Sequence, residues 1–109
     1  MKTGIHNKTL KVGTNWGFLF KVKGRDLRAV AISIIIKRIG TNTPVFNNAT
    51  DGTFSVTLSG ADTVILWDIP YSSTQNVLLG KAYSYDMEVT EAGNRQVYIE
   101  GEINVERNR

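Results

Sequence analysis

The clearest alternation of apolar and polar residues lies in the C-terminal third of the chain. Residues 83–89 place Tyr83, Tyr85, Met87 and Val89 on one face and polar residues on the other. A turn follows at residues 91–94, and the alternation then continues to residue 105. A period of two is typical of half-buried strands, so this region predicts a β-hairpin. Its second strand is expected to direct Val97, Ile99, Ile103 and Val105 inward and Gln96, Tyr98, Glu100, Glu102 and Asn104 outward.

The rest of the chain offers further segments of strand length and no convincing amphipathic helix. Residues 16–22 alternate, whereas residues 27–39 are rich in isoleucine and apolar on both faces, which predicts a central strand. Shorter candidate strands lie at residues 5–12, 44–46, 54–58 and 63–67. A set of about six to eight short strands separated by turns indicates a β-sandwich or a small barrel.

A local feature favours the sandwich. Tyr83 follows a glycine corner at Gly80 and begins a long strand. Immunoglobulin-like folds place a tyrosine there, and its hydroxyl bonds back across the corner; Tyr85 occupies the usual cysteine position. Gly101 falls at an inward position, where glycine often marks a bulge or a close backbone approach. We therefore predict an all-β fold, an immunoglobulin-like antiparallel sandwich of about seven strands, with structural roles for Tyr83, Tyr85 and Gly101.

Length and composition limit the organisation of the chain. Its 109 residues, 41% of them hydrophobic, suffice for one core but not for two domains. We expect a single sandwich domain over residues 1–109, with residues 1–7 and 106–109 as flexible arms. Cysteine is absent, which excludes thiolate metal ligands and favours folding in a reducing cytoplasm. The longest apolar run, residues 29–36, has the length of a strand, so we expect no signal peptide and no membrane span.

The charge is distributed unevenly along the chain. The net charge is +3, but residues 1–40 hold nine lysines and arginines against one acid, whereas residues 41–109 hold four basic residues against nine acids. Such asymmetry is typical of a protein with an anionic partner or of a surface that docks on its own copies. Strands from both halves that interleave in a sandwich would instead mix these charges on the surface.

Residue sets for catalysis are missing from the sequence. The only histidine, His6, lies near the N-terminus, where a catalytic triad has little support. The glycine-containing segment 13–17 lacks the lysine of a phosphate loop. Asp62 could approach Asp51 or Asp68 across a loop, but no dense pattern of calcium ligands surrounds them. We therefore predict a protein that is not an enzyme and binds no cofactor and no metal.

Nucleic-acid binding is an alternative. Residues 16–25 interleave aromatic and basic residues, as binders of single strands do. The alternation, however, puts the aromatic residues on one side and Lys21 and Lys23 on the other, which indicates a core face backed by a solvent face. This alternative therefore rests on the basic segment 21–28, namely Lys21, Lys23, Arg25 and Arg28, and we regard nucleic acid as a disfavoured partner.

A further alternative is a module that binds a carbohydrate or a receptor. It would use Trp67 and Tyr71 together with acidic residues of the loops on one edge of the domain.

Several segments together resemble a known group of proteins. They are GKAYSYDMEV at residues 80–89, YIEGEINV at 98–105 before an arginine-containing end, Asp26-Leu27 before a long strand, and DGTFSVTLS at 51–59. This set, spread over residues 16–107, resembles small structural proteins of tailed bacteriophages. It is most similar to the immunoglobulin-like N-terminal domains of upper baseplate and tail-fibre adaptor proteins. The ending at residues 106–109 lacks the threonine that precedes arginine in those proteins, so head decoration also stays open.

The resemblance implies a virion component that is assembled in the host cytoplasm. It would act in the baseplate, in tail-fibre attachment or in head decoration, through contacts with other virion proteins and with itself as a homo-oligomer. The expected contact elements are the basic segment, the irregular loop 69–77 and the two terminal arms. The candidate partner-binding residues are Lys21, Lys23, Arg25, Arg28, Tyr71, Arg107 and Arg109.

Overall fold

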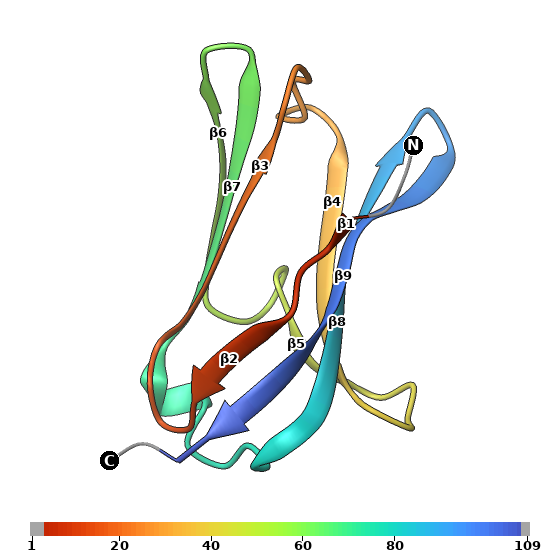
Figure 1. Cartoon of the computed structure of the whole chain (residues 1–109). Coiled ribbons are helices and arrows are strands. Elements are labelled where there is room, and N and C mark those ends of the chain that lie inside the picture. Colours follow the sequence, from red (N-terminus) through yellow and green to blue (C-terminus); the bar gives the residue numbers. More distant parts are fainter. Residues whose placement is uncertain (1–3, 108–109) are drawn as a thin grey trace.

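The computed structural model describes residues 4–107, and its regular secondary structure is almost entirely β-strand (Figure 1). Among these residues there are nine strands and one short 3₁₀ turn, η1, at Tyr71–Ser73. The strands are β1 (Gly4–Ile5), β2 (Lys8–Lys11), β3 (Trp16–Val22), β4 (Ala31–Arg38), β5 (Pro44–Asn47), β6 (Thr53–Ser59), β7 (Asp62–Ile69), β8 (Gly80–Glu91) and β9 (Asn94–Glu106).

The strands form two facing sheets. One sheet has the order β1-β9-β8-β4-β5, with β2 also paired to β9, and the other has the order β3-β7-β6. The pairs are antiparallel except where β1 and β2 run parallel to β9. This is the topology of an immunoglobulin sandwich, in which β9, β8, β4 and β5 correspond to strands G, F, C and C′ and β3, β7 and β6 to B, E and D. The predicted fold class is therefore confirmed.

The core lies between the sheets and is unusually aromatic. Trp16 and Phe18 of β3 and Trp67 of β7 are fully buried. The ring of Phe18 stacks on Trp67 with centroids 5.3 Å apart and contacts Tyr85 of β8 at 5.5 Å. Strands B and F carry the disulfide of antibody domains. Here aromatic packing between β3 and β8 joins the two sheets at that place instead.

The corner before β8 has the hydrogen bond that the sequence pattern predicts. The hydroxyl of Tyr83 accepts a bond of 2.8 Å from the backbone N–H of Leu78, five residues upstream. Gly80, between them, has φ of +88°, a conformation that favours glycine. The buried ring thus fixes the β7–β8 connection to the sheet.

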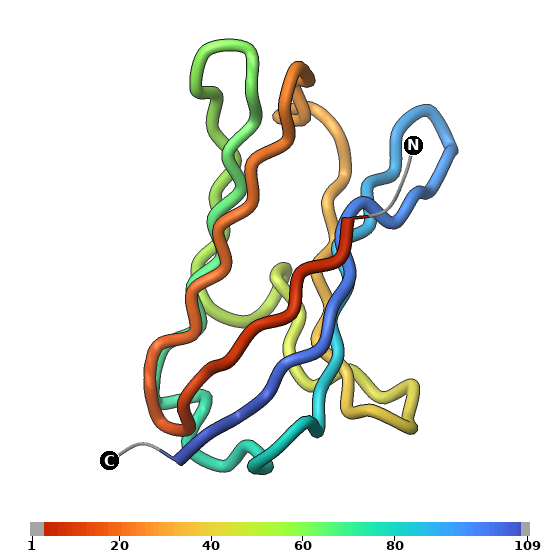
Figure 2. The backbone as a smooth tube through the Cα atoms, in the orientation of Figure 1, coloured from red at the N-terminus to blue at the C-terminus, as the bar shows by residue number. Residues whose placement is uncertain are grey.

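The N-terminal segment runs parallel to β9 and passes Gly101 between β1 and β2; Figure 2 shows the two backbones side by side. A Cβ atom on Gly101 would lie 1.9 Å from the carbonyl oxygen of His6, so no other residue fits without movement. The hydroxyl of Tyr85 donates a bond of 2.5 Å to this carbonyl, and the side chain of Asn7 accepts one of 3.0 Å from the N–H of Glu102. Of the two roles expected for Gly101, the close backbone approach is the one observed.

The second strand of the hairpin contains a bulge that the alternation did not predict. Met87 pairs with Ile99 and Glu88 with Val97, so Tyr98 is an extra residue in β9. Tyr98 is consequently buried, with 6% exposure, and Val97 shares the outer face with Glu88. The predicted directions of Tyr98 and Val97 are therefore wrong, because a one-residue insertion reverses the alternation beyond it.

The predicted limits of two segments also need correction. The isoleucine-rich strand begins at Ala31 rather than at Leu27, although Leu27 is fully buried in the loop before it. The expected flexible arms are partly strand: residues 4–5 pair with β9, the N–H of His6 bonds to Glu100, and Glu106 pairs with Lys11. Residues 1–3 and 108–109 of those arms lie outside the described residues.

Asn48 fastens the edge strand β5 to the sheet. Its side-chain oxygen accepts a bond from the N–H of Ile34, and its side-chain nitrogen donates to the carbonyl of Ile32. The side chain therefore continues the β4–β5 pairing past Asn47, where the sequence indicated only a turn. Within residues 4–107 no helix has the length and apolar character needed to cross a membrane.

Candidate protein-binding surfaces

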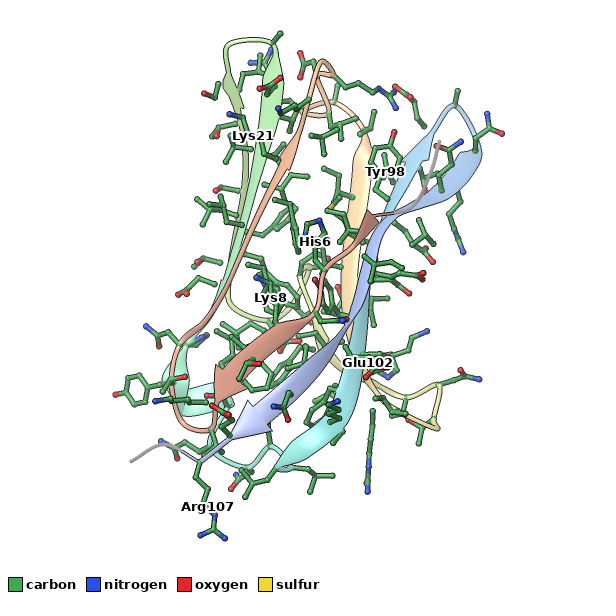
Figure 3. All side chains as sticks on the ribbon, in the orientation of Figure 1. His6, Lys8, Lys21, Tyr98, Glu102 and Arg107 are labelled. Carbon is green, nitrogen blue, oxygen red and sulfur yellow. The ribbon has the colours of Figure 1, made fainter. Side chains whose placement is uncertain are left out.

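The basic segment 21–28 begins at the end of β3 and continues into the β3–β4 connection, at one end of the sandwich (Figure 3, Lys21). Lys21 points to the outer face and forms an ion pair of 3.6 Å with Asp62 of β7. The other carboxylate oxygen of Asp62 accepts a bond of 2.9 Å from the N–H of Gly24. Asp62 therefore attaches the start of the connection to the three-stranded sheet.

Arg25 attaches the same connection to the six-stranded sheet. Its guanidinium donates to Glu91 over 2.5 Å and to the hydroxyl of Tyr98, and it lies 5.9 Å from the centre of the Tyr98 ring. The pKa of Arg25 is raised, mainly by the hydrogen bond to Glu91. Its carbonyl accepts a bond from the buried hydroxyl of Thr63, which in turn accepts one from the N–H of Leu27. Arg25 thus joins the two sheets at this end.

The remaining cations of the segment differ in their contacts. Arg28 donates to the two carboxylate oxygens of Asp26 from Nε and Nη2, at 3.0 and 2.9 Å, and these bonds lower the pKa of Asp26 to about 2. Lys23 forms no ion pair or hydrogen bond among the described residues. The basic segment therefore presents one unpaired charge, while the aromatic rings beside it, Trp16, Phe18 and Phe20, are buried and closed to stacking with bases. Nucleic-acid binding stays an untested alternative.

The other predicted contact residues lie at the opposite end of the sandwich. Tyr71 is 59% exposed in η1, and its N–H donates to the side chain of Asn15. Arg107 follows β9 and is exposed (Figure 3). The bonds from Gly13 to Thr74 and from Val12 to Glu106 bring their segments together. The predicted residues therefore divide between two ends and do not form one site, and Arg109 lies outside the described residues.

The aromatic edge proposed for a carbohydrate module is not present as expected. Trp67 is fully buried, and its indole N–H donates a bond of 2.7 Å to the carbonyl of Asp51. It therefore belongs to the core and leaves Tyr71 as the exposed aromatic side chain of that proposal.

The outer face of the six-stranded sheet is acidic. Asp86 of β8 lies directly opposite Glu100 of β9, with Glu88 and Glu102 near them on the same face. Burial, and then the charges of Glu88 and Glu100, raise the pKa of Asp86, although Lys37 opposes this. A surface hollow of about 370 Å³ lies over this region, between β1 and β8, and Asp86, Glu100 and Glu102 line it. The alternation predicted that these residues point outward, but it did not indicate that a hollow lies over them.

The outer face of the three-stranded sheet has a different character. Leu19 of β3 and Leu66 of β7 lie opposite each other and are 63% and 46% exposed. Hydroxyl residues of β6 border them, beginning with Ser55 opposite Leu66. Sequence reasoning missed this pair because each leucine is a single residue in its own strand, and only the pairing of the strands brings them together.

The described residues contain no group of three or more histidine, cysteine, aspartate or glutamate side chains that would hold a metal ion. His6, the one histidine, has an exposed side chain and contributes its backbone to the sheet. What residues 4–107 offer to a partner is therefore a charged face, an apolar pair and two loop-bearing ends.

Comparison with solved structures finds three that are similar to this chain. The BTLA ectodomain matches with a TM-score of 0.62 at 14% identity, over 97% of this chain and 94% of that chain. A structure of the ZIG-8–RIG-5 IG1–IG1 heterodimer matches at 15% identity and a TM-score of 0.44, over 96% and 83% of the chains. The extracellular fragment of novel immune-type receptor 11 from Ictalurus punctatus matches at 13% identity and a TM-score of 0.43, over 100% and 89%.

No family model and no curated protein sequence matches the chain. At 14% identity the likeness to the BTLA ectodomain establishes the fold alone. The chain is an immunoglobulin-like β-sandwich, and its function has to be argued from its own surfaces.

Proposed function

We propose that this chain is a non-enzymatic structural protein of a tailed-phage particle, where it binds other virion proteins and copies of itself. The baseplate, the tail-fibre attachment and the head surface are its candidate positions. The proposal is supported by the sequence resemblance of residues 80–89 and 98–105, which belong to β8 and β9. It is also supported by the charged outer face of β8 and β9, because charged surface groups can guide and orient a protein partner.

The observation that carries a binding role is the crowding of carboxylates on the outer face of β8 and β9. Asp86 and Glu100 are direct cross-strand neighbours, and like charges in that position cost about 0.2–1 kcal/mol. The pKa of Asp86 is raised first by burial, and the charges of Glu88 and Glu100 add to this effect. A basic protein surface would relieve the repulsion between these like charges on binding. We therefore assign this face to a cationic protein partner in the assembled particle.

Mass spectrometry of purified particles tests the proposal directly. We expect the chain at a stoichiometric level, with copy number equal to or a multiple of the symmetry of its position. Particles that contain no such amount would rule out the virion role.

A pair of variants tests which surface is used. Asp86→Asn combined with Glu100→Gln removes two charges from the acidic face, and we expect lower incorporation into particles at normal expression. Ser55→Asn changes an exposed residue on the other sheet and serves as the matched control, with incorporation unchanged. Equal incorporation of both variants would show that the acidic face is not the contact surface. The virion role itself would still be tested by the mass spectrometry of particles.

A further inference from the structure

The strand β3 has a free edge. It pairs with β7 on one side, and no described strand pairs with the other side. In immunoglobulin domains with an ABED sheet, strand A occupies this place beside strand B. Here the N-terminal segment pairs with β9 of the other sheet instead, through β1 and β2. Along residues 16–22 this edge of β3 is therefore not paired with a described strand, although the side chain of Lys8 in β2 lies over the rings of Phe18 and Phe20.

Of the free edges in the described chain, β3 is the one best suited to pair with another strand. The edge strand β5 is short, at four residues, and contains Pro44, which has no N–H to donate. The edge strand β6 carries hydroxyl side chains on its outer face. The strand β3 is as long as β6, at seven residues, but exposes Leu19 beside Leu66. A long edge with exposed apolar side chains is typical of strands that add to another sheet.

The sequence of β3 is complementary to itself in an antiparallel register centred on Leu19. In that register Leu19 lies opposite its own copy, Phe18 opposite Phe20, and Lys21 opposite Gly17. The two lysines are then about 13 Å apart along the strand direction, because each lies two residues from the centre. No like charges oppose each other, and the exposed leucines of the two copies come into contact.

The same register offers each Lys21 a new partner. Gly17 pairs with Asp68 of β7, and a Cβ atom on Gly17 would lie 3.8 Å from a carboxylate oxygen of Asp68. Among residues 4–107 the Asp68 carboxylate forms no ion pair or hydrogen bond. A lysine from a second copy, opposite Gly17, would extend across the space that a larger side chain would fill and reach Asp68. Its present ion pair with Asp62 is exposed, and such pairs contribute little.

We propose that two copies of this chain pair through their β3 edges, antiparallel about a two-fold axis at Leu19, and so form one continuous six-stranded sheet. The dimer contact consists of backbone hydrogen bonds between the edges, the Leu19 contact and two symmetric Lys21–Asp68 ion pairs. This interface uses neither the acidic face nor the loop ends. It therefore does not depend on the role in a phage particle, and it leaves those surfaces free for other partners.

Light scattering after size exclusion, together with sedimentation equilibrium, tests this proposal on the full chain. At about 100 μM protein we expect twice the mass of the 12.1 kDa chain. Leu19→Lys places two lysines directly opposite each other at the axis, and we expect at least a tenfold weaker dimer. Because Leu19 is exposed, the variant should keep the wild-type circular dichroism spectrum. Thr57→Lys on β6, on the same outer face, is the matched control and should dimerise like wild type.

A charge exchange distinguishes this register from other ways of pairing. Lys21→Asp and Asp68→Lys should each weaken the dimer about tenfold, and the double variant should recover most of the loss. Hydrogen exchange should show protection of the β3 amides that grows with concentration. A wild-type monomer at about 100 μM, a Leu19→Lys dimer of unchanged affinity, or a charge exchange without recovery would each overturn the proposal. A heterologous strand bound at β3 with no self-association would likewise overturn it.

Discussion

The two sheets of this sandwich differ in how their corresponding edges are treated. The edge of β9 is covered by the N-terminal strand, which is held by Tyr85, Asn7 and the space at Gly101. The corresponding edge of the other sheet, β3, is left open. The N-terminal segment covers the edge of one sheet. Because it pairs with β9, the edge of β3 in the other sheet is left free. The covered edge therefore depends on particular residues at the contact, namely Tyr85, Asn7 and Gly101.

The outer faces of the two sheets differ as well. The covered sheet carries the acidic residues of β8 and β9, whereas the open sheet carries Leu19 and Leu66 among hydroxyl side chains. Repulsion on the first face discourages two copies from stacking there, while the second has no such obstacle. The charge asymmetry along the chain is thus partly preserved on the folded surface, because the acidic second half supplies both β8 and β9.

Gly101→Ala is expected to have the largest effect on this comparison, because it removes the cover. The added Cβ meets the carbonyl of His6 at 1.9 Å, so the N-terminal strand has to move away and the bond from Tyr85 is lost. We expect the free energy of unfolding to fall by about 3 kcal/mol in urea denaturation. Gly4→Ala, whose Cβ would meet its neighbours at ordinary distances of 3.6 Å or more, is the control and should change stability little. Equal effects of the two variants would contradict the close approach.

Tyr85→Phe keeps the core packing and removes only the hydroxyl that holds the cover. We expect a loss of about 1 kcal/mol near neutral pH, because the carbonyl of His6 then lacks its donor. Burial raises the pKa of Tyr85 from 10.0 to about 12. Between these values the unfolded chain releases a proton that the folded chain retains, so this residue lowers the stability of the wild type as the pH rises from 10 to 12. The difference between wild type and Tyr85→Phe should therefore narrow in alkaline urea titrations; a widening gap would refute this assignment.

Asp86→Asn tests the repulsion on the acidic face. The raised pKa means that the folded chain binds a proton more tightly at Asp86 than the unfolded chain does, mainly because of burial. The contribution of Asp86 to the free energy of unfolding therefore increases as the pH falls through the folded-state pKa toward 3.8. This contribution is lowest at neutral pH. The variant should be more stable than wild type by about 0.5 kcal/mol at neutral pH and should lose this advantage in acid. Thermal unfolding of wild type and variant at neutral and at acidic pH measures this difference in stability. A variant less stable than wild type at neutral pH would show that neighbouring carboxylates do not repel Asp86.

Leu19→Thr on the open edge is expected to have the smallest effect on the folded monomer. The side chain is largely exposed, so its replacement should change the free energy of unfolding by less than about 0.5 kcal/mol in dilute solution. Urea denaturation at sub-micromolar protein measures it. A large loss there would mean that Leu19 supports the sandwich itself and that the edge of β3 is not open.

The fold class followed from alternation and one corner tyrosine, and both are local properties of the chain. Alternation failed at Tyr98, because a bulge is set by the pairing with β8 and leaves no mark in the period of β9. Asn48 lies in a turn, as its residue type suggests, but no local pattern indicates that its side chain also bonds to the backbone of Ile32 and Ile34 in β4. The predicted contact residues were chosen by charge and exposure along the sequence. The structure separates them between two ends, and it pairs Lys21, Arg25 and Arg28 with acids of their own chain.

By itself, the sequence predicted an all-β sandwich with Trp16, Phe18 and Phe20 on a core face, because the period-two alternation within a regular strand is a local property of the chain. It also marked Gly101 as the position of a bulge or of a close approach by another part of the backbone. Only the tertiary structure decided what comes close, namely the carbonyl of His6, and that β3 consequently keeps a free edge. The physical reason is that strand pairing joins residues far apart in the sequence, here His6 and Gly101, and no local pattern records which of the available edges a strand will choose.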